Sequence, residues 1–122
     1  MAYKPFDLTG KVALVTGGNG GIGFGMVEAM AQAGADIVIW GSNAQKNADA
    51  EDRLKATGVR VLTQVVNVAD EHAVAAGMAE AVAKMGRVDT VVANAGIGGG
   101  AKSFSEFPPE TYRKVLSVNL DG

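Results

Sequence analysis

Apolar residues along this chain alternate between short runs and longer stretches with helical spacing. Short, mostly apolar runs bounded by glycine or polar residues predict strands at 12–16, 37–40, 60–66 and 88–93. Stretches of helical periodicity, three of which stop at a glycine, predict helices at 22–33, 44–56 and 70–85, and a further helix from Pro108 or Pro109 to at least Asn119. The chain therefore consists of alternating strands and helices.

Such alternation with short links predicts parallel strands joined by right-handed crossovers. The expected fold class is α/β, a doubly wound parallel sheet of Rossmann type, in a single domain over residues 1–122. Ligands of these sheets bind beyond the carboxyl ends of the strands. We therefore expect the segments 16–17, 41–42, 67–68 and 94–96 to converge on one edge of the sheet.

Composition narrows the range of partners. A net charge of −2 and the lack of any basic run argue against a nucleic-acid partner. The sequence has no cysteine and one histidine, so we expect no disulfide, no thiolate chemistry and no metal site. No segment approaches the ~20 apolar residues of a membrane span. We expect a cytoplasmic protein that has no membrane partner.

A glycine-rich segment, Thr-Gly-Gly-Asn-Gly-Gly-Ile-Gly at 16–23, follows the first predicted strand. It fits two registers, the generic G-x-G-x-x-G starting at Gly18 and T-G-x-x-x-G-[IL]-G starting at Thr16. Glycines let the backbone turn tightly and approach a ligand. The helix that follows directs unpaired N–H groups and the positive end of its dipole at an anion. The segment therefore predicts a cradle for the pyrophosphate of a dinucleotide.

The end of the second predicted strand bears on which dinucleotide is bound. The generic fingerprint expects an acid there, about 20 residues after the glycines, to bind the ribose hydroxyls. This strand instead ends in Trp40-Gly41-Ser42-Asn43, without an acid. A missing carboxylate removes repulsion against a 2′-phosphate, and Ser42 and Asn43 can donate hydrogen bonds to one. The residues therefore favour NADP slightly over NAD, and both stay open.

Two further motifs, Asn94-Ala95-Gly96 and Val118-Asn119-Leu120, follow in order along the chain. Together with the segment 16–23 in the T-G-x-x-x-G-[IL]-G register, they resemble the short-chain dehydrogenase/reductase family. The resemblance extends from about Leu8 to Gly122. It implies an NAD(P)-dependent oxidoreductase that transfers hydride between nicotinamide and an alcohol or ketone.

The resemblance also implies roles for single residues. Asn94 would brace the sheet, Asn67 stands where the family often carries an adenine-contacting Asp, and Asn119 would be a catalytic residue that holds a water in a proton relay. The residues expected to contact the cofactor lie in the glycine-rich segment and at the other strand ends. They are Gly17, Asn19, Gly20, Gly21, Ile22, Gly23, Ser42, Asn43, Asn67, Val68, Asn94, Ala95 and Gly96.

The rest of the family's chemistry is missing from these residues. The family donates its proton from a Tyr with a Lys four residues later, assisted by a Ser. Tyr112 is followed four residues later by Leu116, and no Y-x-x-x-K occurs in the sequence. The apolar run 88–93 would also form an unprotected sheet edge. We therefore expect a fold truncated after the fourth strand and its following helix, which is the cofactor-binding half of an enzyme and inactive by itself.

Two alternatives remain open. One is a dinucleotide-binding module without catalysis. The other is an S-adenosylmethionine-dependent methyltransferase, which also has a glycine loop after its first strand but expects an acid at the end of the second. The family resemblance further implies a homo-oligomer, a dimer or tetramer, for the intact protein.

Overall fold

The computed structural model describes residues 4–122, so residues 1–3 of the domain expected over 1–122 lie outside it. Strands and helices alternate as predicted. The strands are β1 (Val12–Thr16), β2 (Asp36–Gly41), β3 (Val61–Val65) and β4 (Thr90–Val92). The helices are α1 (Gly21–Gln32), α2 (Ala44–Leu54), α3 (Glu71–Met85) and α4 (Pro109–Leu116). Short 3-10 helices lie at Lys4–Phe6, Lys55–Thr57 and Phe104–Glu106, and a π-helical turn, Ser117–Asp121, continues α4.

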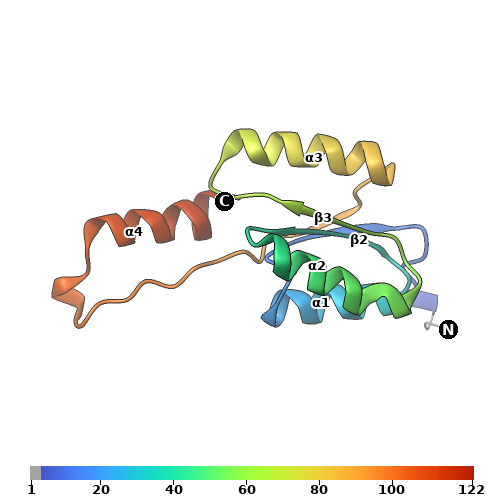
Figure 1. Cartoon of the computed structure of the whole chain (residues 1–122), viewed down its shortest axis with the longest axis horizontal. Helices are drawn as coiled ribbons and strands as arrows, with labels where there is room; N and C mark the ends of the chain where they lie inside the picture. The colour runs from blue at the N-terminus through green and yellow to red at the C-terminus, as the bar shows by residue number, and fades with distance from the viewer. Residues whose placement is uncertain (1–3) are drawn as a thin grey trace.

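The strands form one parallel sheet in the order β3-β2-β1-β4. Val12 pairs with Asp36 of β2, and Ala13 pairs with Thr90 of β4. Figure 1 shows α1 and α2 beneath one face of the sheet and α3 above the other, which confirms the doubly wound α/β fold. β4 is an outer strand of the sheet in the described residues, and its Val91 is 53% exposed.

Side chains from the central strands build an apolar core on each face of the sheet. Successive residues of a strand point to opposite faces. Val15, Ile37 and Ile39 therefore pack toward α1 and α2, while Leu14 and Val38 pack toward α3. All five are fully buried. This burial on both faces is the reason the strands appear in the sequence as continuous apolar runs rather than as alternating ones.

The helices end where the sequence predicts, because glycines adopt the left-handed backbone that stops a helix. Gly34, Gly58 and Gly86 have φ angles of +102°, +75° and +86°. At the other ends, the Asn43 side chain accepts the Lys46 N–H at 2.9 Å and so caps α2. β4 is shorter than the predicted run 88–93, because it pairs with β1 alone and the ladder covers only three residues.

α4 lies beyond the carboxyl edge of the sheet, at the end of an extended segment (Figure 1). None of its residues is buried. The chain then returns toward the loop between β3 and α3, where Gly122 lies against Val68. None of the helices in residues 4–122 is long and apolar enough to cross a membrane.

Candidate cofactor-binding site

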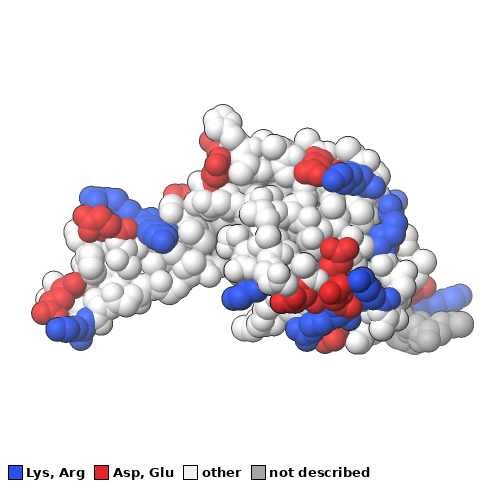
Figure 2. All heavy atoms as spheres, viewed as in Figure 1, with Lys and Arg blue, Asp and Glu red and all other residues white. Residues whose placement is uncertain are grey.

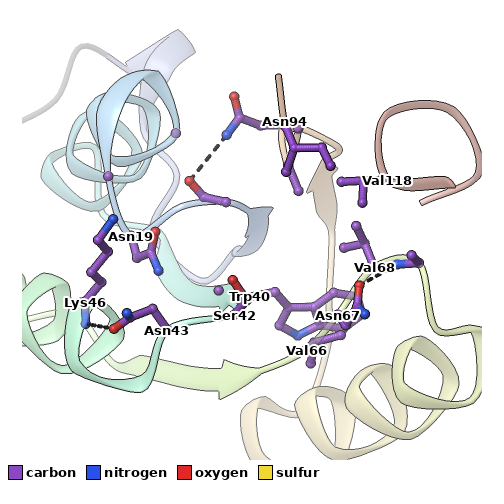
Figure 3. A pocket seen from close by; sticks show the side chains of 18 of the residues that line it. Asn19, Trp40, Ser42, Asn43, Lys46, Val66, Asn67, Val68, Asn94 and Val118 are labelled. Atoms are coloured by element: carbon purple, nitrogen blue, oxygen red, sulfur yellow. Dashed lines mark hydrogen bonds between the residues drawn. The ribbon is translucent and has the colours of Figure 1, made fainter. Parts of the chain in front are cut away.

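A pocket of about 720 Å³ opens at the carboxyl edge of the sheet. Its walls come from the loops after β1, β2, β3 and β4 and from the end of α4 (Figure 3). The predicted convergence of the strand ends is therefore confirmed. All the residues that the sequence assigned to the cofactor line this pocket, with the exception of Gly21.

The glycine-rich turn needs its glycines for two different reasons. Gly17 and Gly21 have φ angles of +65° and +55°, in the left-handed region that other residues rarely adopt. Gly23 needs space instead, since a Cβ there would lie under 3.0 Å from both the Gly17 carbonyl oxygen and Asn94 Nδ2. α1 thus begins in direct contact with the turn. Gly21 therefore matters for the shape of the turn through its φ angle, although it does not line the pocket.

The amino end of α1 faces the pocket without a side-chain cap. Gly20 is its N-cap residue and offers no side chain to the first N–H groups. Gly20 and Ile22 both line the pocket. Uncapped N–H groups at the positive end of a helix dipole form a binding site for a phosphate group.

Hydrogen bonds tie the ends of β1 and β4 together. Thr16 Oγ1 accepts the backbone N–H groups of Asn94 and Ala95, both at 2.9 Å. Asn94 Nδ2 donates in return to the Thr16 carbonyl oxygen at 3.0 Å. Thr16 is only 7% exposed, so these bonds are shielded from water. The backbone at 94–96 is therefore held at a fixed position along the pocket.

Trp40 and Asn67 lie on the side of the pocket opposite Asn94, near α3 (Figure 3). Trp40 is 4% exposed, and its Nε1 donates to the Gln64 side-chain oxygen at 2.8 Å. The Asn67 side-chain oxygen accepts the Ala69 N–H at 3.0 Å. Trp40 packs in the core below the sheet edge and lines the pocket at the same time.

Asn119 lies outside the pocket lining. Its side-chain oxygen accepts the Ile97 N–H at 2.8 Å, and its Nδ2 donates to the Ile97 carbonyl oxygen at 3.0 Å. The amide thus fixes the loop after β4 against the end of α4. The catalytic role expected for Asn119 stays a prediction.

Residues of α4 and its π-helical turn also line the pocket, and the sequence reasoning missed them. Lys114, Ser117 and Val118 contribute to its wall. Their spacing of three and four residues places them on one helical face, which is the signal that could have found them.

The charge at the pocket suits an anionic ligand. Its lining includes Lys46 and Lys114 and contains no Asp or Glu. On the face drawn in Figure 2, acidic and basic side chains are interspersed rather than gathered by sign. Within residues 4–122, no three His, Cys, Asp or Glu side chains come together as a metal site.

A doubly wound parallel sheet, a glycine turn and an uncapped helix at its carboxyl edge define a nucleotide-binding α/β protein of the Rossmann type. Residues 11–122 match the short chain dehydrogenase family, and the chain belongs to it.

The chain is similar to several curated relatives. It is 44% identical over 123 aligned positions to the sorbose reductase of Candida albicans, covering 96% of this chain and 42% of the relative. It is 37% identical to a probable NADP-dependent mannitol dehydrogenase of Yarrowia lipolytica, with the same coverages of 96% and 42%.

Among solved structures, NAD+-bound xylitol dehydrogenase superposes with a TM-score of 0.89 at 30% identity, covering 93% of this chain and 44% of that one. The chain thus spans less than half the length of these relatives.

Proposed function

We propose that the pocket binds a nicotinamide dinucleotide and that a protein carrying this chain transfers hydride between the nicotinamide and a small alcohol or ketone. The observation that carries the proposal is the uncapped amino end of α1 beside a pocket lined by two lysines and no carboxylate. A dinucleotide brings a pyrophosphate that needs such a site.

In the proposed binding mode, the pyrophosphate lies at the turn formed by Gly17 and residues 19–23. The adenosine lies toward Ser42, Asn43, Asn67 and Val68. The ribose of the nicotinamide half passes the backbone at 94–96, where no large side chain blocks it. The cofactor supplies the hydride when bound. The chain's own residues hold it and align it along the sheet edge.

We further propose NADP as the preferred cofactor. Lys46, which lies beside Asn43 at the pocket (Figure 3), and the lack of an acid after β2 both favour a 2′-phosphate. One relative is named a probable NADP-dependent mannitol dehydrogenase, whereas the xylitol dehydrogenase was solved with NAD+, so the comparisons include relatives named for either cofactor.

The substrate we propose is a small polyol or the matching ketose. Sorbose, mannitol and xylitol, the substrates in the names of the three relatives, belong to this chemical class. We also propose that the intact enzyme is a cytoplasmic homo-oligomer. The 122 residues alone lack the Tyr and Lys pair for proton donation, so we expect them to bind cofactor without turnover.

Equilibrium titration tests the proposal. NADPH and NADH are added to the chain while nicotinamide fluorescence is followed, with ADP-ribose and S-adenosylmethionine as competitors. We expect saturable binding of one dinucleotide per chain, displaced by ADP-ribose and not by S-adenosylmethionine. No dinucleotide binding, or displacement by S-adenosylmethionine, would overturn the proposal. Turnover of a polyol by the 122 residues would contradict the expectation that they bind the cofactor without catalysing the reaction.

A further inference from the structure

The space above Gly41, the last residue of β2, is filled by two side-chain amides. A Cβ built at Gly41 would lie under 3.0 Å from both Asn19 Nδ2 and Asn47 Oδ1. These two atoms form a hydrogen bond of 2.9 Å between them. The backbone at Gly41 is outside the left-handed region, so the two amides, and not the backbone conformation, obstruct a side chain there.

Asn47 cannot give way easily. It is 3% exposed, and its Nδ2 donates to the carbonyl oxygens of Gly41 at 3.1 Å and Gln64 at 3.2 Å. Its Oδ1 accepts from Asn19. Any shift of this amide would leave buried polar groups without partners, which is costly. The Asn19–Asn47 pair therefore connects the glycine turn to α2 and to the strands β2 and β3.

The Asn19–Asn47 pair lies at the end of β2, where other dinucleotide-binding sheets contact the ribose of the cofactor. In dinucleotide-binding sheets, the acid that binds the ribose hydroxyls stands at the end of the second strand, about 20 residues after the glycine turn. In this chain that position is Gly41. Asn19 lies on the side of the pocket where Ser42, Asn43 and Lys46 gather (Figure 3). The volume that an acidic side chain would enter is thus occupied by neutral amides.

We propose that the Asn19–Asn47 pair excludes an acidic side chain from the end of β2 and so keeps the 2′-position of this pocket free of a carboxylate. By filling the space over Gly41, the pair closes the position from which a carboxylate would bind the 2′-hydroxyl and repel a 2′-phosphate. An acidic substitution at residue 41 alone then does not make the pocket selective for NADH. The inference rests on the proposed function, because it concerns the same pocket.

A double-mutant cycle tests the proposal through dissociation constants for NADPH and NADH. Gly41→Asp is made in the natural chain and in a chain that carries Asn19→Ala and Asn47→Ala. Gln45→Ala is the matched control, because this exposed amide of α2 bonds only to Asp49 in the described residues and lies outside the pocket. Circular dichroism checks that each variant is folded. Asn47→Ser replaces Asn47→Ala if the alanine variant is not folded.

In the natural chain, we expect Gly41→Asp to weaken both dinucleotides together and to change the ratio of the two dissociation constants less than about threefold. With the pair removed, the new carboxylate can face the 2′-position. The ratio should then shift at least about tenfold toward NADH, since close like charges repel strongly at low dielectric constant. Gln45→Ala should leave both constants unchanged.

An equal shift of the ratio in both backgrounds would overturn the proposal, and so would no shift in the folded variant that lacks the pair. Failure of the proposed function gives a different result, because the natural chain would then bind neither NADPH nor NADH.

Discussion

Replacing Gly23 by alanine should separate the glycine turn from α1 and weaken both the fold and cofactor binding. The new Cβ would lie under 3.0 Å from the Gly17 carbonyl oxygen and from Asn94 Nδ2, whereas ordinary contacts begin at about 3.4 Å. The Gly17 atom belongs to backbone, so the clash is relieved only if the start of α1 moves away from the turn. The N–H groups of α1 would move with it and leave their position at the pocket.

Three contributions set the change in the free energy of unfolding that Gly23→Ala causes. Overpacking of a close contact costs about 1–3 kcal/mol. Loss of the Asn94 side-chain bond to Thr16 costs about 1 kcal/mol more. The better helix propensity of alanine returns about 1 kcal/mol. We therefore expect the free energy of unfolding to fall by about 1–3 kcal/mol and the affinity for NADPH to fall at least about tenfold.

Urea unfolding followed by the emission of Trp40, the only tryptophan in the sequence, measures the first effect. Gly25→Ala is the matched control on the same helix, because Gly25 is exposed and a Cβ there meets nothing within 4 Å. We expect that control to gain about 0.5–1 kcal/mol and to keep full affinity. If Gly23→Ala is as stable as Gly25→Ala and binds NADPH equally well, the argument from close packing is wrong.

Three more predictions concern hydrogen bonds at the ends of β1 and β4 and in the loop after β4. Thr16→Val leaves the N–H groups of residues 94 and 95 unpaired and should lower the free energy of unfolding by about 1–3 kcal/mol in urea, whereas Thr16→Ser should not. Asn119→Ala should speed hydrogen exchange of the Ile97 amide, and an unchanged exchange rate would refute the bracing role. The Arg87 guanidinium, and after it the Val12 N–H, hold the pKa of Asp89 below its ordinary value of 3.8. Because the folded pKa is the lower one, this stabilisation is complete above the ordinary value and is lost as the pH falls through the folded pKa. A urea series at decreasing pH should therefore show a flatter acid decline for Asp89→Asn.

Local patterns predicted most of the fold because its central strands, β1 and β2, are buried on both faces. Val15 and Val38 sit in continuous apolar runs, and Gly34, Gly58 and Gly86 stop helices by backbone conformation alone. Strand positions and helix ends of this kind depend only on residues that are close together in the chain, so the sequence is enough to predict them. The positions of the glycine turn and of the strand ends around the pocket followed from these rules.

Features that depend on tertiary partners were not predicted. Asn47 stands in a polar helix and gives no local sign of burial, because its partners Gly41 and Gln64 come from two different strands. Lys114 reaches the pocket only because α4 returns toward the sheet edge after a long excursion. Such contacts are set by the path of the chain in space.

A crystal structure of this chain with NADPH would show directly whether the dinucleotide binds at the carboxyl edge of the sheet. We expect electron density for the pyrophosphate at the N–H groups of residues 20–23 and for the 2′-phosphate beside Ser42 and Lys46. Density for the dinucleotide elsewhere on the surface, or an empty pocket at saturating NADPH, would contradict this expectation.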